Sequence, residues 1–309
     1  MSVHIIRPGH PLTPADTHNL SADHPAAREW AHNSSDAKPD VLLHCGDLTH
    51  VGGVASFKKA INMLRTLDAE LKLVIPGNHD LELDKDYWAT QCSLEKDPED
   101  PDDHPAAIAT MTGQAAKEAG VTFLSEGVHT FTLKNGATFN IYVSPYTPAF
   151  GDWAFAYQHH EDRFNSPSQV QEGVTSVAVN PIPDDVPIDI VMTHGPPSGI
   201  LDWCPQGTVG CPNLLKALGR VRPKMHCFGH IHEGNEAEII DWSKRVVSGN
   251  ATGDTRSYKS NRIERNYPAS NSEIIVAGQE TLAVNAAIMN GDDQPTNKPW
   301  LVTLDLGQK

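Results

Sequence analysis

Four short polar motifs in this sequence combine metal-ligand side chains with glycine. They are Gly46-Asp47, Gly77-Asn78-His79-Asp80, His194 before Gly195-Pro196-Pro197, and Gly229-His230-Ile231-His232. Carboxylate and amide oxygens mixed with imidazole nitrogens suit Mn²⁺, Fe or Zn²⁺ better than Mg²⁺ or Ca²⁺. His230 and His232 stand two residues apart and are placed to bind two neighbouring ions from one turn. These residue types predict metal chemistry.

Each motif follows a short apolar run typical of a buried strand. The runs are "DVLLHC" (40–45), "LKLVI" (71–75), "IDIVMT" (188–193) and "KMHCF" (224–228). Residues 57–67 repeat apolar side chains at helical spacing behind Ser56, so strand, helix and strand predict a right-handed parallel crossover. Side chains at the carboxyl ends of strands gather where α/β proteins bind their ligands. Each motif alone is a weak signal, and their conjunction at successive strand ends indicates one site.

The rest of the chain predicts further strands and helices around two polar segments. Residues 93–107 are acidic and proline-rich and predict a surface loop, and residues 243–272 predict a surface insertion. We expect helices near 113–119 and 213–220, and strands near 121–124, 129–133, 138–143 and 299–306. Without a repeat or a long linker, the chain is predicted to form one α/β domain over residues 1–309, with insertions at about 93–112 and 243–272.

Composition restricts the class of partner. The 309 residues include 24 basic and 39 acidic side chains, which gives a net charge of −15 and argues against a nucleic-acid or anionic-membrane binder. A small phosphorylated substrate stays compatible, because bound cations reverse the charge locally. No apolar run approaches membrane-spanning length. Five cysteines without a CxxC pattern and no apolar signal core predict free thiols and a cytoplasmic protein. The oligomeric state is not predicted.

The order of the motifs resembles that of the calcineurin-like metallophosphoesterases. Asp16/His18, Gly46-Asp47, Gly77-Asn78-His79-Asp80, His194 and Gly229-His230-Ile231-His232 supply all five signature blocks. The stretches "MTHGPPSGILDW", "VRPKMHCFGHIHEG" and "NAAIMNGDDQPTNKP" are similar to the metallophosphoesterase-domain proteins of animals and fungi, which are related to class III cyclic-nucleotide phosphodiesterases. The resemblance implies a four-layered α/β/β/α sandwich.

The resemblance also implies a role for each motif residue. Asp47 would bridge two divalent ions. Asp16, His18 and His232 would complete one metal site, and Asn78, His194 and His230 the other. His79 would face the leaving oxygen and donate a proton, oriented by Asp80. Two divalent ions would offset the charge of the phosphate and activate a water.

The implied activity is phosphodiester hydrolysis on cyclic nucleotides or other small phosphodiesters. A phosphomonoesterase of the same superfamily is the alternative within this chemistry. A degenerate, non-catalytic binding protein is the alternative outside it, and the net charge disfavours a nuclease.

The segment around Asp16 departs from the expected pattern. Leu12-Thr13-Pro14-Ala15 precedes Asp16 and His18 and does not read as a strand, and the only β-like run before it is residues 3–6. We therefore expect the first strand to be displaced or irregular, and this side of the metal site to be the looser one.

Other aromatic side chains and histidines give weaker signals. Trp153 and Phe155 would either stack a nucleobase or pack in the core. His44 is expected to be a packed or supporting histidine, and we expect surface positions for His50, His159 and His160.

Overall fold

The computed structural model describes residues 2–3, 39–95, 103–243, 259–262, 275–297, 299–300 and 302–307. This part of the chain forms two main sheets, and each of them contains parallel strands. The smaller sheet has the order β2-β3-β4, and its strands are β2 (Val41–His44), β3 (Leu71–Val74) and β4 (Val121–Phe123). Helix α2 (Val54–Arg65) connects β2 to β3, which pair in parallel. The predicted parallel crossover is confirmed.

The larger sheet has seven strands in the order β16-β15-β17-β14-β11-β6-β5. Its four central strands, β6, β11, β14 and β17, pair in parallel, while β5, β15 and β16 pair antiparallel. Their bounds are β5 Gly127–Thr132, β6 Thr138–Ser144, β11 Ile190–Thr193, β14 Met225–Phe228, β15 Ala237–Asp241, β16 Lys259–Arg262 and β17 Glu280–Asn285.

The two sheets pack against each other through an apolar layer. Leu43 and Leu73 of the small sheet share this layer with Ile141, Met192 and Cys227 of the large one. All five are buried, because the strands that carry them are covered on both faces and read as continuous apolar runs.

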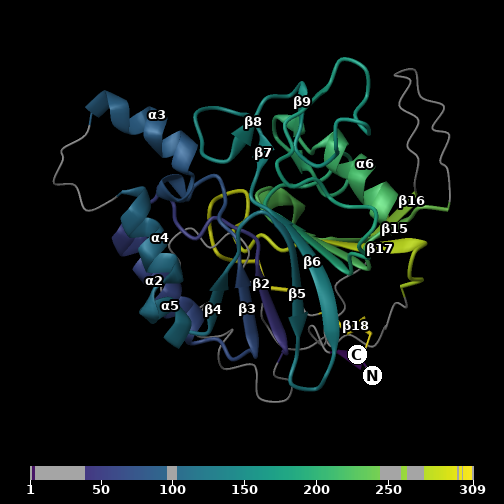
Figure 1. Cartoon of the computed structure of the whole chain (residues 1–309), viewed down its shortest axis with the longest axis horizontal. Helices are drawn as coiled ribbons and strands as arrows, with labels where there is room; N and C mark the ends of the chain where they lie inside the picture. Colours follow the sequence, from purple (N-terminus) through teal and green to yellow (C-terminus); the bar gives the residue numbers. More distant parts are fainter. Residues whose placement is uncertain are drawn as a thin grey trace.

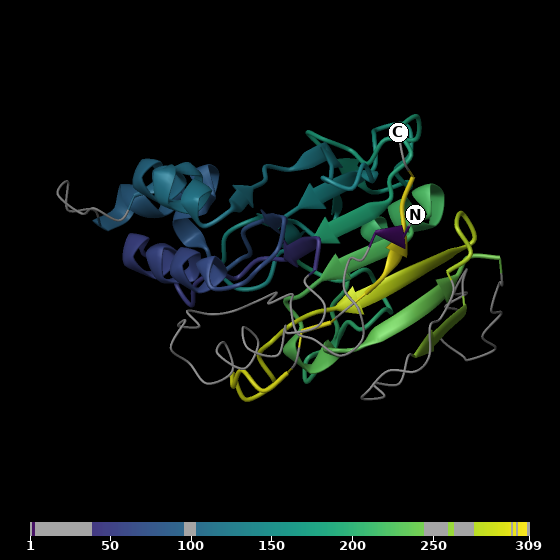
Figure 2. The same cartoon turned by 90° about the horizontal axis from the view of Figure 1, so that it is seen from below.

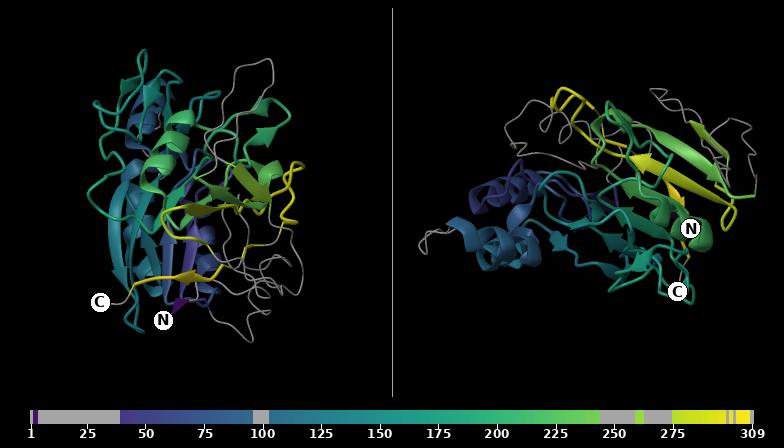
Figure 3. Two further views of the ribbon diagram at one scale, coloured as in Figure 1. Left: turned by 90° about the vertical axis from the view of Figure 1, so that its right-hand side faces the viewer. Right: turned by 90° about the horizontal axis from the view of Figure 1, so that it is seen from above.

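Helices cover the outer face of each sheet. Leu42 and Val74 pack with Phe57 of α2 and with α4 (His104–Thr112) and α5 (Gln114–Glu118), whereas Val191 and Phe228 pack with α6 (Pro212–Val221). Figure 1 shows α2, α4 and α5 on one side of the strands and α6 on the other. The views from below in Figure 2 and from above in Figure 3 (right) keep this separation. The four-layered α/β/β/α sandwich is therefore confirmed.

Short elements connect these layers. They are η1 Leu81–Leu83, α3 Lys85–Glu95, β7 Thr147–Pro148, β8 Ala156–Tyr157, β9 Glu161–Asp162, β10 Thr175–Ser176, β12 Trp203–Cys204, β13 Gly207–Thr208 and η2 His232–Gly234. No helix in the described ranges is both long and apolar enough to cross a membrane.

The predicted surface loop over residues 93–107 is wrong at both of its ends. Helix α3 extends to Glu95, and α4 begins at His104 and buries Ala107 and Met111 against α2. The carboxylate of Asp103 accepts a hydrogen bond of 2.7 Å from the N–H of Ala106 and so caps α4. The acidic, proline-rich composition concealed a core helix with an ordinary start signal.

A short strand near the N-terminus pairs with a strand near the C-terminus. β1 (Ser2–Val3) pairs antiparallel with β18 (Leu304–Asp305), in a two-stranded sheet of its own. Asp16 and His18 lie outside the described residues, as does most of the predicted 243–272 insertion. Within that insertion, β16 adds an edge strand to the large sheet. The predicted closing strand over 299–306 is limited to β18.

Candidate metal centre

Three potential metal ligands from both sheets meet at the carboxyl ends of their strands. Asp47 follows β2, His194 follows β11 and His230 follows β14. Their ligand atoms all lie within 4.8 Å of one another, a group found by searching the described residues. A divalent ion bound about 2.0–2.2 Å from each ligand holds its ligand atoms roughly 3–4 Å apart. The observed spacing is close to that requirement, so this group could hold an ion.

Two glycines allow the sheets' loops to come this close. A Cβ on Gly77 would lie 2.3 Å from Oδ1 of Asp47 and 2.6 Å from Cε1 of His194. A Cβ on Gly46 would lie 2.5 Å from Nδ1 of His194 and 2.8 Å from Cα of Gly77. The two loops therefore touch backbone to backbone directly beneath the candidate ligands.

The backbone is strained at two of these ligands. Asp47 has a φ of 50° and His230 a φ of 68°, and both residues carry a side chain. Such left-handed conformations cost about 1–3 kcal/mol each and persist where the surrounding structure enforces them. They aim both side chains into the cluster.

His194 is held in the tautomer that a metal ligand requires. Its Nδ1 donates to the carbonyl of Cys45 at 2.8 Å, which leaves the lone pair on Nε2. That Nε2 lies 2.7 Å from Oδ1 of Asn78 and 3.3 Å from Oδ2 of Asp47. Acceptor atoms thus converge on one point, as they do around a cation.

Asn78 adds an observation of its own. It is fully buried, and its Nδ2 finds no hydrogen-bond partner within the described ranges. A buried amide is normally paired. Its oxygen faces the Nε2 lone pair of His194, so this arrangement fits a residue whose amide serves as a ligand rather than as a structural bridge.

Asp80 fixes the two loops that carry Asp47 and Asn78. Its Oδ2 accepts hydrogen bonds from the N–H groups of Leu48 (3.1 Å) and Gly77 (2.8 Å), and its Oδ1 from the N–H of Thr49 (2.9 Å). The pKa of this carboxyl is raised to about 7: burial is the largest cause and the negative charge of Asp47 adds to it, while the bonds from Gly77, Leu48 and Thr49 lower it. A cation bound to Asp47 would remove the repulsion between the two carboxylates.

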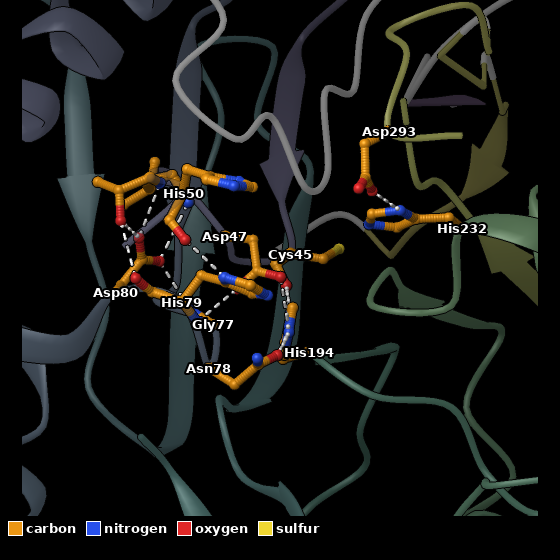
Figure 4. Close-up of polar contacts among 12 residues, drawn as sticks. Cys45, Asp47, His50, Gly77, Asn78, His79, Asp80, His194, His232 and Asp293 are labelled. Atoms are coloured by element: carbon orange, nitrogen blue, oxygen red, sulfur yellow. Dashed lines mark hydrogen bonds and ion pairs between the residues drawn. The ribbon is translucent and has the colours of Figure 1, made fainter. Parts of the chain in front are cut away.

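His79 lies beside the cluster with its ring oriented by the main chain. Its N–H donates to Oδ1 of Asp47 at 2.9 Å, and its ring Nδ1 donates to the carbonyl of His50 at 2.6 Å. The indole of Trp153 packs against this ring with centroids 4.1 Å apart. Figure 4 shows Asp80, His79, Asp47 and His194 gathered in one region. Asp80 supports the loop that carries His79, and the carbonyl of His50 accepts a hydrogen bond from the His79 ring.

His232 points elsewhere in this structure. Its Nδ1 lies 3.2 Å from Oδ1 of Asp293, and Figure 4 shows this pair apart from the Asp47 group. Three of the expected ligands, Asp47, His194 and His230, are brought together with Asn78. His232 is not in that group, and Asp16 and His18 lie outside the described residues.

Several contacts around the cluster escaped the sequence analysis. The carbonyl of His50 accepts a hydrogen bond from the ring of His79. The side chain of His50 is exposed, as expected. Phe150, for which the sequence predicts no role, places its ring 5.2 Å from that of His230. A signal was available, because Phe150 stands beside Gly151 in the loop that follows β7. Phe155 belongs to the apolar core.

Two buried histidines support the strands from inside. His44 of β2 is fully buried, in line with a packed role. His226 of β14 donates from Nε2 to the hydroxyl of Thr193 at 2.8 Å, and that hydroxyl donates to the Gly195 carbonyl at 2.7 Å. Burial lowers the pKa of His226 to about 3, so it stays neutral and fixes the turn at His194.

Comparison with known proteins agrees with this geometry. Residues 15–234 match the sequence profile described as calcineurin-like phosphoesterase. The chain is 33% identical over 206 residues to human metallophosphoesterase domain-containing protein 1, which covers 63% of this chain and 55% of that protein. The chain thus spans about half the length of this relative.

Two other relatives differ in extent. A probable rhamnogalacturonate lyase C of Emericella nidulans is 30% identical over 231 residues, which are 73% of this chain and 19% of that protein. A probable cyclic nucleotide phosphodiesterase of Vesicomyosocius okutanii is 54% identical over 41 residues, which are 13% of this chain and 17% of that protein. The similarity to the lyase extends over most of this chain, whereas the similarity to the phosphodiesterase is limited to a short segment.

Proposed function

We propose, from the premise that this chain belongs to the calcineurin-like phosphoesterase family, that it hydrolyses small phosphodiesters with two bound divalent metal ions. One observation carries the proposal. Asp47, His194 and His230 place three ligand atoms within 4.8 Å of one another at the joined carboxyl ends of the two sheets. The mixture of carboxylate and imidazole fits Mn²⁺, Fe or Zn²⁺.

The proposed ligand assignment divides the residues between two sites. Asn78, His194 and His230 would hold one ion, and Asp47 would contribute to both sites. His232, Asp16 and His18 would hold the other ion, which requires His232 to exchange its contact with Asp293 for the metal. Ions bound there would supply positive charge for the phosphate oxygens and a water of lowered pKa.

The residues of this chain supply the proton and the positioning. The Nδ1–H of His79 is engaged by the His50 carbonyl, and its Nε2 would exchange a proton with the leaving oxygen of the ester. Trp153 packs on the His79 ring and limits its rotation. Asp80 ties together the loops of Asp47 and His79 through Leu48, Thr49 and Gly77.

A cyclic nucleotide is the proposed first choice of substrate. The support is the local similarity to a probable cyclic nucleotide phosphodiesterase, together with the net charge of −15, which disfavours long nucleic acids. We further propose a single domain in the cytoplasm. The buried free thiols of Cys45, Cys204, Cys211 and Cys227 support a reducing compartment.

Metal content and turnover test the proposal together. Purified protein loaded with Mn²⁺ should contain about two ions per chain by elemental analysis. It should hydrolyse bis(p-nitrophenyl) phosphate faster than p-nitrophenyl phosphate. Faster turnover of the monoester would identify a phosphomonoesterase instead. Turnover of neither substrate, with less than one ion bound, would identify a non-catalytic binding protein.

The side of the site that lies outside the described residues has its own test. Asp16→Ala should lower both the metal content and the turnover of the diester. Unchanged values for both would show that Asp16 is not a ligand.

A further inference from the structure

The loop between β7 and β8, residues 149–155, is fastened to the candidate metal centre. β7 and β8 pair in parallel, and Ala149 N–H donates to the Tyr157 carbonyl at 2.8 Å. On the far side of the loop, Ala154 N–H donates to the carbonyl of Asn78 at 3.3 Å. Phe155 N–H donates to Oδ2 of Asp84 at 2.6 Å. Both ends of the loop are therefore fixed, one of them to a residue of the proposed ligand set.

The loop carries two aromatic side chains to different parts of the site. Trp153 packs on the ring of His79 at 4.1 Å, and Phe150 approaches the ring of His230 at 5.2 Å. Gly151 lies between them with a φ of 56°, and this left-handed turn separates the two directions. One loop thus contacts both the proposed proton donor and one of the proposed metal ligands.

Phe150 differs from the other aromatic residues of this segment in its exposure. It is 47% exposed, whereas Phe155 is 5% exposed and packs in the core. A half-exposed phenyl ring that contributes little to the core keeps one face for another partner. Aromatic faces stack on planar rings of any identity, because every such ring has a π-face.

The position of Phe150 relative to His79 selects which part of a substrate it meets. If His79 faces the leaving oxygen, the ester group retained on phosphorus points away from His79. Phe150 contacts His230, whose ring lies 4.8 Å from that of His194, whereas Trp153 contacts His79. A retained group directed away from His79 and toward His230 would therefore meet Phe150.

We propose that Phe150 is a specificity-determining residue that stacks on a planar ring in the ester group retained on the phosphate. This proposal rests on the proposed phosphodiester hydrolysis and narrows its substrates to diesters that carry an aromatic or heteroaromatic group. Trp153 is a positioning residue that acts through His79.

Paired substrates and paired variants test the role of Phe150. Bis(p-nitrophenyl) phosphate and ethyl p-nitrophenyl phosphate release the same nitrophenolate and differ only in the retained group. With Mn²⁺-loaded protein, Phe150→Leu should lower kcat/KM about tenfold on the first substrate, mainly through KM, because it removes one stacking contact. On the ethyl ester the loss should stay below about twofold. Phe150→Tyr keeps the ring and should retain the wild-type preference.

A binding measurement separates this proposal from that of the activity. Calorimetric titration of the Mn²⁺-loaded protein with adenosine 5′-monophosphate and with ribose 5-phosphate compares ligands with and without a base. Phe150→Leu should weaken only the first, by about tenfold. Equal effects of Phe150→Leu on both members of each pair, or no effect on either, would overturn the role of Phe150. Selective weakening of nucleotide binding in a protein that hydrolyses neither diester would overturn the proposed activity and uphold the role of Phe150.

Discussion

Gly77→Ala adds one methyl group at the contact between the β2 and β3 loops. The new Cβ would stand 2.3 Å from Oδ1 of Asp47, 2.4 Å from the backbone nitrogen of Asp47 and 2.6 Å from Cε1 of His194. All three atoms belong to Asp47 and His194, which are both proposed metal ligands. No flexible side-chain end is available to move aside, so the loops themselves must separate.

The distances set the size of the effect. Ordinary van der Waals contact begins at about 3.4 Å, so the methyl group displaces its neighbours by roughly 1 Å. Overpacking of this kind costs about 1–3 kcal/mol of folding free energy. A displacement of about 1 Å in a catalytic group can cost about 100-fold in rate. We therefore expect the variant to stay folded and to lose about 100-fold in kcat/KM.

Three measurements on Gly77→Ala check this expectation. Elemental analysis after dialysis should show a loss of bound Mn²⁺, and hydrolysis of bis(p-nitrophenyl) phosphate should fall. Urea unfolding should give the stability change. Gly307→Ala is the matched control, because a Cβ at Gly307 meets nothing within 4 Å. If Gly77→Ala retained wild-type metal content and turnover, the close approach of these loops would not be what positions Asp47 and His194.

Three further predictions concern charge, packing and thiol burial. In the metal-free protein the pKa of Asp80 is raised from 3.8 to about 7, so folding takes up a proton between these values. The contribution of Asp80 to the free energy of unfolding is fully present below about pH 4 and is lost as the pH rises through about 7. Urea unfolding in EDTA should show this decline with pH, and Asp80→Asn should make the pH dependence smaller. Phe57 of α2 is fully buried, so Phe57→Ala should lower the free energy of unfolding in urea by about 3–5 kcal/mol, with metal content retained in the folded fraction. A decrease below about 1 kcal/mol would contradict its core position. The Sγ atoms of Cys45 and Cys227 lie 3.3 Å apart between the sheets. Mass spectrometry should find both thiols unlabelled by maleimide in the native protein and labelled in urea. Rapid labelling of the native protein would show that the sheets open.

Strand identity and the place of the site were predictable because apolar runs and polar motifs alternate clearly. The runs before Asp47, Asn78, His194 and His230 all form strands, and the chain brings these four residues together. Parallel pairing sends the carboxyl ends of neighbouring strands to one edge, so position along the chain translates into position in space. The outer layers followed from the family resemblance.

The contacts made by loops were not predictable in the same way. Phe150 and His230 are 80 positions apart in sequence, and their contact depends on how β7, β8 and Gly151 aim the loop. The pairing of His232 with Asp293 likewise depends on tertiary geometry. Helix α4 was missed for a different reason, because the acidic composition around it outweighed the local cap at Asp103.

The hydrogen bond from Ala154 to the Asn78 carbonyl offers a route for thermodynamic linkage between two binding events. It places the loop of Phe150 and a proposed metal ligand on one connected piece of backbone. If an ion at Asn78 orders that loop and so tightens nucleotide binding by some factor, the nucleotide must tighten binding of the ion by the same factor. The affinity for Mn²⁺ measured without a ligand would then be a lower limit. Titrating Mn²⁺ with and without adenosine 5′-monophosphate measures this coupling directly.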